Sequence, residues 1–398
     1  MSWQTKKLGD VCDIIKRGIA PKYLEDGGVC VINQKCIRDH AINYDLARRH
    51  DVSVKKVPQE RYIKVGDVLV NSTGTGTLGR VAQVRNMPVE PSTVDTHVTI
   101  VRPKEDYFFD EFFGYMLIMI EDQITSSGEG ASGQTELSRT KLEKEFFVSY
   151  PTSKSEQQKI VTILDKAFVD IEQARANTEQ NLQNARELFE SYLQQVFSER
   201  GEGWQKFVFS DLCEITSKLV DPRESEFLDY PHIGAANITS VTGELTEIKT
   251  AREEQLKSGK FVFDESMVLY SKIRPYLMKT CRPNFVGLCS ADIYPLVPNK
   301  ELITRDFLFY LLTTQHFTDY AISGSSRAGM PKVNRTHLFN YTCHIPSVEE
   351  QEMLVEKLNL MMEKSEKLQG IYQSKLAALD ELKQSLLQQA FTGQLTQG

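Results

Sequence analysis

The stretch that begins at Ser153-Lys154-Ser155-Glu156-Gln157 occurs twice, because Ser347-Val348-Glu349-Glu350-Gln351 lies 194 positions later without a gap. The two copies also end alike, at Ser191-Tyr192-Leu193-Gln194-Gln195-Val196-Phe197 and Ser385-Leu386-Leu387-Gln388-Gln389-Ala390-Phe391. Each copy opens with a Ser that is followed three residues later by a Glu, the pattern of a capping box at a helix start. The repeat therefore predicts two long helices of the same kind.

Apolar residues recur at steps of three and four along both copies, which is typical of a coiled-coil seam. The two seams comprise Ile160, Leu164, Phe168, Ile171, Ala174, Leu182, Ala185, Phe189, Tyr192 and Val196, and Leu354, Leu358, Met361, Leu368, Tyr372, Leu376, Leu379, Leu386 and Ala390. Thr178 and Ser365 interrupt them. A helix of this length extends roughly 65 Å. One apolar stripe is not stable alone in water, so we expect each copy to pack on the other.

The composition is that of an ordinary protein of two or more domains, with 398 residues and a net charge of −7. The helical segments 151–203 and 346–398 hold 11 basic and 17 acidic residues, which accounts for −6 of that charge. No apolar run approaches the ~20 residues of a membrane span, and the N-terminus does not resemble a signal peptide. The seven cysteines form no C-x-x-C pair and the seven histidines are scattered. We therefore expect a cytoplasmic protein with reduced thiols and no zinc.

The segments between the helices also repeat. Trp3-Gln4 and the residues after it match Trp204-Gln205, and the stretch from Gly133 to Leu142 matches Gly329 to Leu338. Short apolar runs and period-two stretches predict strands at Val29–Ile32, Asp67–Val70, Thr96–Val101, Val268–Tyr270 and Ile293–Leu296, with amphipathic helices over 110–123 and 306–320. We predict an α+β chain of four parts: a mixed α/β domain (1–150), a long helix and linker (151–203), a second such domain (204–345), and a second long helix with a tail (346–398).

Polar and glycine-rich loops of the two domains contain the side-chain types that reach base edges and phosphates of nucleic acid. The candidates in the first domain are Lys16, Arg17, Lys22, Tyr23, Asn33, Gln34, Lys35, Asn71, Ser72, Thr75 and Arg80. In the second domain they are Lys218, Asn237, Lys272, Arg274, Tyr276 and Arg327. The alternative for each is an exposed loop side chain without a partner. His97 is expected to be packed or hydrogen-bonded, and Arg139 and Arg335 to tie each domain to its helix.

No catalytic motif is found in the sequence. It has no phosphate loop ending in Gly-Lys-Ser/Thr, and it lacks the Asn/Asp-Pro-Pro-aromatic signature of adenine methyltransferases. Gly74-x-Gly76-x-x-Gly79 precedes no helix of a βαβ unit, so a dinucleotide site is not indicated. Three functions stay open at this point: a reader of DNA sequence, a coiled-coil scaffold or adaptor with two protein-binding domains, and an enzyme of another type.

The chain as a whole resembles the DNA-specificity subunit of type I restriction–modification enzymes. The resemblance rests on the Trp-x₄-Leu/Phe-x-Asp-Val/Leu-Cys domain starts, the Glu156-Gln157 and Glu350-Gln351 helix starts, and the two Leu-Gln-Gln helix ends. Phe391-Thr392-Gly393-Gln394-Leu395 also matches the usual ending of the family. Since recognition domains vary in this family, the resemblance transfers no base-contacting residue to this sequence.

The resemblance implies two target-recognition domains that each read one half of a split, asymmetric DNA target. Two antiparallel helices would separate them as a ruler, with pseudo-two-fold symmetry. Two methyltransferase subunits would dock on the helices and carry S-adenosylmethionine, so that this non-catalytic chain holds no cofactor or metal itself. Motor–nuclease subunits would join for cleavage, unless the system lacks a motor.

Overall fold

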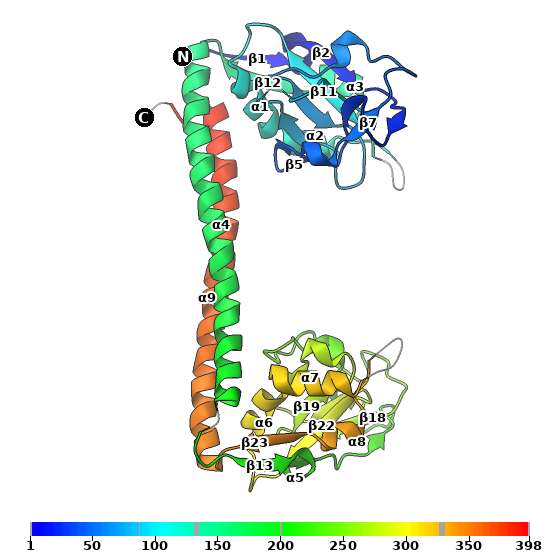
Figure 1. Cartoon of the computed structure of the whole chain (residues 1–398), viewed down its shortest axis with the longest axis vertical. Helices are drawn as coiled ribbons and strands as arrows, with labels where there is room; N and C mark the ends of the chain where they lie inside the picture. The colour runs from blue at the N-terminus through cyan, green and yellow to red at the C-terminus, as the bar shows by residue number, and fades with distance from the viewer. Residues whose placement is uncertain (1, 87, 131–134, 200, 326–330, 397–398) are drawn as a thin grey trace. The chain divides into compact units, whose positions relative to one another are not determined.

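The computed structural model describes the whole chain except residues 1, 87, 131–134, 200, 326–330 and 397–398. It consists of two compact units, residues 1–177 with 376–398 and residues 178–375. Figure 1 shows that each unit combines a mixed α/β domain with segments of the two long helices. The helices are α4 (Lys154–Ser198) and α9 (Val348–Phe391), which begin next to the two repeated motifs.

The domain of the first unit contains two four-stranded sheets, ordered β10-β4-β7-β3 and β2-β11-β8-β9, and a β1-β12 pair that closes next to α4. Its strands are β1 (Trp3–Lys7), β2 (Cys12–Arg17), β3 (Tyr23–Leu24), β4 (Val29–Ile32), β5 (Ile37–Arg38), β6 (Ala41–Ile42), β7 (Arg48–His50), β8 (Val68–Asn71), β9 (Val81–Gln83), β10 (Ser92–Val94), β11 (Val98–Pro103) and β12 (Phe147–Pro151). Its short helices are α1 (Asp110–Met119), α2 (Glu121–Ser126) and α3 (Arg139–Lys144). All named strand pairs are antiparallel except β10 with β4.

The domain of the second unit repeats this plan, with sheets ordered β15-β18-β21-β16-β17 and β14-β22-β19-β20 and a β13-β23 pair. Its strands are β13 (Gln205–Val208), β14 (Cys213–Glu214), β15 (Leu219–Val220), β16 (Pro231–Ile233), β17 (Lys249–Thr250), β18 (Lys260–Phe263), β19 (Val268–Ser271), β20 (Thr280–Cys281), β21 (Gly287–Ser290), β22 (Ile293–Pro298) and β23 (Thr342–Ile345). Its helices are α5 (Phe209–Leu212), α6 (Arg305–Leu312), α7 (Gln315–Ser323) and α8 (Arg335–Phe339). The expected mixed α/β domains are confirmed, and their sheets are mostly antiparallel.

The amphipathic segments predicted over 110–123 and 306–320 are each broken into two helices. The N-cap of α1 is Phe109, which makes no side-chain cap bond, and Asp110 is the first residue of the helix. In the second unit, Thr314 is the N-cap of α7, and its side chain accepts a hydrogen bond from the backbone N–H of Phe317. This hydroxyl cap starts a new helix, because it satisfies a donor that has no partner within the helix.

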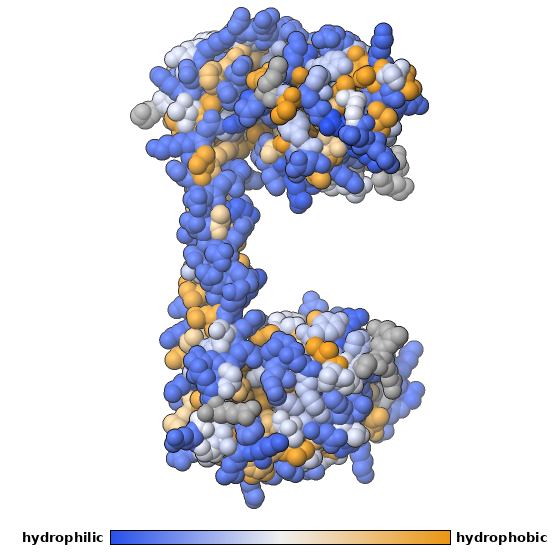
Figure 2. Space-filling view, viewed as in Figure 1, coloured by the Kyte–Doolittle hydropathy of each residue, from blue (hydrophilic) through white to orange (hydrophobic). Residues whose placement is uncertain are grey.

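Each domain shares its hydrophobic core with the helix pair of its own unit. In the first unit, Ile160 and Leu164 of α4 and Leu387 and Ala390 of α9 pack in one cluster with Phe112. In the second unit, Phe189 and Leu193 of α4 and Val355 and Leu358 of α9 lie in the cluster that holds Phe307. The two helices are therefore part of the folded domains, and the face of the helix pair seen in Figure 2 is mostly hydrophilic.

The helices run antiparallel and pair along their predicted seams. Lys383 of α9 forms an ion pair with Glu172 of α4 (3.0 Å), while Asp380 pairs with Arg175, so the residue numbers rise on one helix as they fall on the other. The polar interruptions at Thr178 and Ser365 are both buried. The hydroxyl of Ser365 donates to the carbonyl of Ala185 across the seam (2.7 Å), so it is not left without a partner.

The repeated Gln next to each helix start joins the helix to its domain. Oε1 of Gln157 accepts from the backbone N–H of Phe109 (2.7 Å), and its Nε2 donates to the carbonyl of Pro151 (2.9 Å). In the second unit, Oε1 of Gln351 accepts from Thr304 (2.8 Å), and its Nε2 donates to two carbonyls, those of Leu302 (2.8 Å) and Pro346 (2.9 Å). Both side chains are fully buried.

The predicted capping box is half present at the second helix start, and neither of its bonds is found among the described contacts of the first. The hydroxyl of Ser347 accepts from the backbone N–H of Glu350 (3.3 Å), but the Glu350 carboxylate accepts from the indole of Trp204 (3.1 Å). At the first helix start the side chain of Ser153 makes no cap bond among the described contacts, and Oε1 of Glu156 is buried without a hydrogen-bond partner there. The box pattern therefore identified the helix starts but not the contacts of their acids.

A second attachment joins each domain to its helix through one oxygen atom. In the first unit, Oδ1 of Asp165 on α4 accepts from the hydroxyl of Tyr115 (2.5 Å) and from Arg85 (2.9 Å). In the second unit, Oδ1 of Asn359 on α9 accepts from the hydroxyl of Tyr310 (2.6 Å) and from Arg282 (2.8 Å). Each guanidinium also stacks on its Tyr ring, at 5.0 and 5.2 Å. The same three-part contact thus occurs in both units.

The ion pairs expected from Arg139 and Arg335 to the long helices are not made. Arg139 pairs with Glu143 within α3 (2.6 Å), and Arg335 donates to the carbonyl of Ile215 (3.3 Å) and stacks on Phe339. Both side chains stay within their domains.

Candidate nucleic-acid interface

Three of the predicted residues of the first domain lie at one edge of the β2-β11-β8-β9 sheet. Because neighbouring strands of this sheet are antiparallel, β2 and β8 end at the edge where β9 and β11 begin. That edge brings together Arg17 at the end of β2, Asn71 at the end of β8, and Arg80 just before β9. The structure therefore places residues that are distant in sequence beside one another.

A set of backbone hydrogen bonds holds the loops at this edge. They run from N–H of Asn71 to the carbonyl of Arg80 (2.9 Å), from Ser72 to His97 (2.8 Å), from Leu137 to Ser72 (2.8 Å), and from Gly74 to Thr135 (3.2 Å). Gly74 has a φ of +109°, and a Cβ there would lie 2.4 Å from Oγ1 of Thr77. The loop after β8 is thus tied to the start of β11 and to the segment before α3.

The second domain has the same hydrogen bonds at the equivalent edge. They run from N–H of Ser271 to the carbonyl of Lys279 (2.9 Å), from Lys272 to Asp292 (3.0 Å), from Val333 to Lys272 (2.9 Å), and from Arg274 to Pro331 (2.9 Å). The bridges Thr73–Glu136 and Ile273–Lys332 also correspond. We call this set of bonds the edge frame. It defines which positions of the two domains are equivalent, whatever their side chains.

Several predicted residues at or near the edge frame are engaged in contacts within their domain. Lys16 lies 3.6 Å from Glu60, and Arg17 pairs with Glu136 (2.5 Å) and donates to the carbonyl of Leu137 (2.8 Å). Arg80 donates to the carbonyl of Gly76 (2.8 Å). Since an arginine has five N–H donors, these contacts orient Arg17 and Arg80 without exhausting their capacity.

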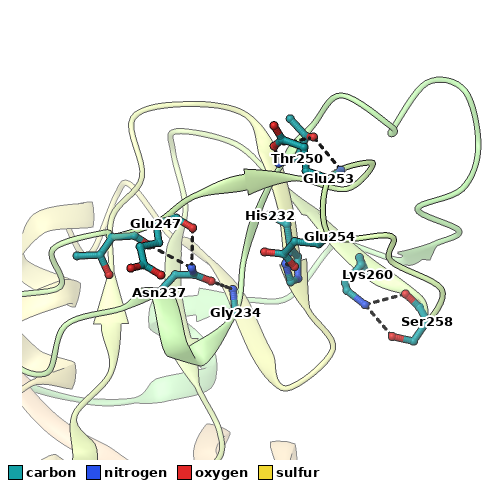
Figure 3. Close-up of polar contacts among 10 residues, drawn as sticks. His232, Gly234, Asn237, Glu247, Thr250, Glu253, Glu254, Ser258 and Lys260 are labelled. Carbon is teal, nitrogen blue, oxygen red and sulfur yellow. Dashed lines mark hydrogen bonds and ion pairs between the residues drawn. The ribbon is translucent and has the colours of Figure 1, made fainter.

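Four predicted side chains are bonded inside the fold. Asn33 donates to the carbonyl of Leu46 (3.0 Å) and accepts from the backbone of Lys35, and Asn71 donates to the carbonyl of Gln34 (3.0 Å). Ser72 is buried with its hydroxyl 2.5 Å from that of Thr99. Asn237 accepts from the backbone of Gly234 and donates to the carbonyls of Thr246 and Glu247, which closes the loop in Figure 3. We assign these side chains a structural role in shaping the loops.

The remaining predicted residues present polar or aromatic groups at the surface. Lys22, Lys35, Thr75, Lys218 and Arg274 are exposed, and Gln34 is half-buried. Tyr23 and Tyr276 are 50% and 53% exposed, and Arg48 stacks on the ring of Tyr23 (4.4 Å). Lys272 is half-buried at the edge frame. Arg327 lies outside the described residues, as do Gly133 and Gly329 of the repeated pattern.

Sequence reasoning did not place four side chains at the candidate interface, although the edge frame positions them there. His97 is exposed with Nδ1 2.6 Å from the hydroxyl of Thr73, so it is hydrogen-bonded as expected, but at the candidate interface. Glu136 pairs with Arg17. Asp292 forms ion pairs with Lys332 (2.9 Å) and Lys272 (3.5 Å). Partial burial opposes ionisation of Asp292, but hydrogen bonds and charge from the two lysines outweigh it and lower its pKa from the usual value of an aspartate.

Two buried polar groups elsewhere in the second domain are bonded to neighbours within it. Nδ1 of His232 lies 2.8 Å from Glu254, and Lys260 donates to the carbonyl and hydroxyl of Ser258 (Figure 3). His232 and Lys260 are buried, with 6% and 5% of their surface exposed. Among the described residues, no group of three or more His, Cys, Asp or Glu side chains is placed to hold a metal. No helix in the described part of the chain could cross a membrane.

Comparison with known proteins gives consistent results. The family described as "Type I restriction modification DNA specificity domain" matches residues 1–180 and 201–373. The specificity subunit of the type I restriction enzyme EcoDI from Escherichia coli is 35% identical over 196 residues, which cover 48% of this chain. The aligned part is 42% of that relative, so the chain matches less than half of its length.

Two solved structures share the fold over almost the whole chain. One comes from work on complex assembly and conformational transition of a type I R-M system, with a TM-score of 0.77, 19% identity, and coverage of 99% of this chain and 98% of that one. The other is the HsdS subunit from Thermoanaerobacter tengcongensis, with a TM-score of 0.62, 19% identity, and coverage of 99% and 97%. On the family match, which spans both domains, the chain belongs to the type I restriction modification DNA specificity domain family.

Proposed function

We propose that this chain is the non-catalytic subunit of a type I restriction–modification complex that reads a bipartite, asymmetric DNA sequence. The observation that carries the proposal is the edge frame, which holds the same backbone geometry in both domains but presents different side chains. A constant frame with variable polar groups suits direct readout, because each base pair offers its own pattern of donors and acceptors in the major groove. Two domains that differ at the frame would read two different half-sites.

The helix pair suits the attachment of other subunits. Segments 151–203 and 346–398 carry 11 basic and 17 acidic residues, so this surface repels DNA phosphates and favours protein partners. We place two methyltransferase subunits here, with S-adenosylmethionine bound by them and not by this chain. Motor–nuclease subunits would join the same complex for cleavage. Such a complex acts on chromosomal DNA, which places it in the cytoplasm.

The exposed lysines, arginines and tyrosines of the two domains would position the duplex. Lys22, Lys35, Lys218 and Arg274 are suited to phosphates, which fix register but carry no sequence information directly. The near-neutral domains would then bind DNA weakly without their partners, since phosphate contacts supply most non-specific affinity.

Methylome sequencing tests this function directly. A host that carries this chain with its methyltransferase subunit is expected to show adenine methylation at one split, asymmetric motif, and deletion of this chain is expected to abolish it. Replacing residues 204–345 with the equivalent domain of another specificity subunit should change one half of the motif only. Retained methylation in the deletion strain would refute the proposal. Recovery of partner proteins without any DNA motif would favour the scaffold alternative instead.

A further inference from the structure

The edge frame places chemically different side chains at equivalent positions of the two domains. The frame bonds make Lys272 equivalent to Ser72, Asp292 equivalent to His97, and Lys332 equivalent to Glu136. Only the second domain therefore has two lysines and one carboxylate at these three positions. We call Lys272, Asp292 and Lys332 the edge triad.

The edge triad is held as a unit at the surface. Oδ1 of Asp292 lies 2.9 Å from Nζ of Lys332 and 3.5 Å from Nζ of Lys272. Lys272 also donates to the carbonyl of Ala291 (2.6 Å) and lies over the ring of Tyr294 (5.2 Å). The side chains of Lys272, Asp292 and Lys332 are 20%, 37% and 41% exposed. They are ordered by their own contacts and still accessible to a ligand.

These contacts leave hydrogen-bonding capacity of a defined kind. An ammonium group has three donors and a carboxylate only acceptors. Lys272 uses donors on Ala291 and Asp292, and Lys332 uses one on Asp292, so both lysines keep at least one donor. Oδ2 of Asp292 has no hydrogen-bond partner among the described residues. The triad therefore presents donors and an acceptor side by side.

We propose that the edge triad reads a G·C base pair through the major groove in the half-site of the second domain. Guanine presents the acceptors N7 and O6 there, while cytosine presents the N4 donor. Lysine donors match the former and a carboxylate acceptor matches the latter. This inference rests on the proposed function and adds which residues determine specificity and which base pair they accept.

The first domain supplies the internal comparison. At the equivalent positions Ser72 is buried, His97 is bonded to Thr73, and Glu136 is paired with Arg17. It therefore lacks the donor–donor–acceptor arrangement. Its half-site should not depend on the triad, so every effect of a triad substitution is confined to one half of the target.

The test uses the full chain assembled with its methyltransferase subunits. Initial methylation rates would be measured on duplexes in which each base pair of the target is replaced in turn. Lys332→Ala and Asp292→Asn are compared with Lys300→Ala, an exposed lysine just beyond the opposite end of β22. The variants first need the same thermal unfolding midpoint as this control, so that loss of folding is excluded.

On the unmodified target, Lys332→Ala is expected to lower the rate roughly 10-fold, the effect of losing one good base contact. It should also remove the preference for G·C at one position of the second half-site. Asp292→Asn is expected to shift acceptance at that position toward A·T, because an amide offers a donor and an acceptor and suits adenine. Lys300→Ala should leave the whole profile unchanged.

Two results would overturn the inference while leaving the proposed function intact. One is a uniform loss on every duplex with a smaller salt dependence, which is the signature of a phosphate contact. The other is a wild-type target with no G·C requirement in the half-site of the second domain. If the wild-type complex methylates no bipartite sequence at all, the proposed function itself fails.

Discussion

Replacing Gln351 with Leu should destabilise the second unit, and it should cost more free energy of unfolding than the equivalent substitution of Gln157 costs the first unit. The side chain is fully buried and satisfies three backbone groups, the N–H of Thr304 and the carbonyls of Leu302 and Pro346. Leu keeps a similar volume but leaves all three groups without a partner. Each buried unsatisfied group costs about 1–3 kcal/mol, so we expect the free energy of unfolding to fall by roughly 3–9 kcal/mol.

The first unit provides a graded comparison for this prediction. Gln157 satisfies only two backbone groups, those of Phe109 and Pro151. Gln157→Leu should therefore cost roughly 2–6 kcal/mol, about two-thirds of the cost of Gln351→Leu. Gln158 lies next in sequence on the exposed side of α4, so Gln158→Leu serves as the control, with a change within about 0.5 kcal/mol.

The chain contains its own reporters for the measurement. Its two tryptophans are Trp3 and Trp204, one in each unit. In a Trp3→Phe background, urea unfolding followed by fluorescence reports on the second unit, because Trp204 bonds Glu350 beside Gln351. A Trp204→Phe background reports on the first unit. If Gln351→Leu loses no more stability than Gln158→Leu, the side chain does not join helix and domain as argued.

Three further predictions follow from the contacts. Burial lowers the pKa of His232, although the charge of Glu254 opposes this shift. The unfolded chain therefore binds more protons below about pH 6.5, so the second unit should lose stability as the pH falls through that value. His232→Gln should make the urea midpoint of the second unit less dependent on pH. Tyr310→Phe should cost about 1 kcal/mol, and in an Asn359→Ala background much less, which a double-mutant cycle measures; equal losses would exclude the shared contact. Seven residues inserted into each long helix, after 177 and after 375, would lengthen the helix pair by about 10 Å. The spacer between the two methylated half-sites should then grow by about 3 bp. An unchanged spacer would refute the idea that the helices set the spacer length.

Much of the architecture was predictable because its signals are local and repeated. The helix starts at Ser153 and Ser347 and the apolar steps of three and four depend on neighbours within two turns of one helix. The partners of the helix-start acids were not predictable, since Trp204 reaches Glu350 from 146 residues away. The break at Thr314 was also missed, because in the sequence a Thr that caps a second helix cannot be told from a Thr inside one continuous helix.

The candidate interface was predictable by type of residue but not by exposure. Asn71 and Ser72 end a buried strand, and their side chains complete hydrogen bonds of the sheet edge. The sequence gives no sign that Asp292 and Lys332 meet, since 40 positions separate them and neither lies in a motif. The edge frame is a product of chain topology, which single-sequence patterns do not encode.

The two units keep their attachments alike and differ at their edges, and this separation has a functional consequence. Tyr115 and Tyr310 make the same contact with a long helix, whereas Asp292 replaces His97 at the edge frame. The side chains of the edge triad are partly exposed, so their replacement should cost little folding free energy. Target preference can therefore change through the edge without loosening the domain from its helix. If edge substitutions destabilised a unit as strongly as Gln351→Leu, recognition and attachment would not be separate properties of this fold.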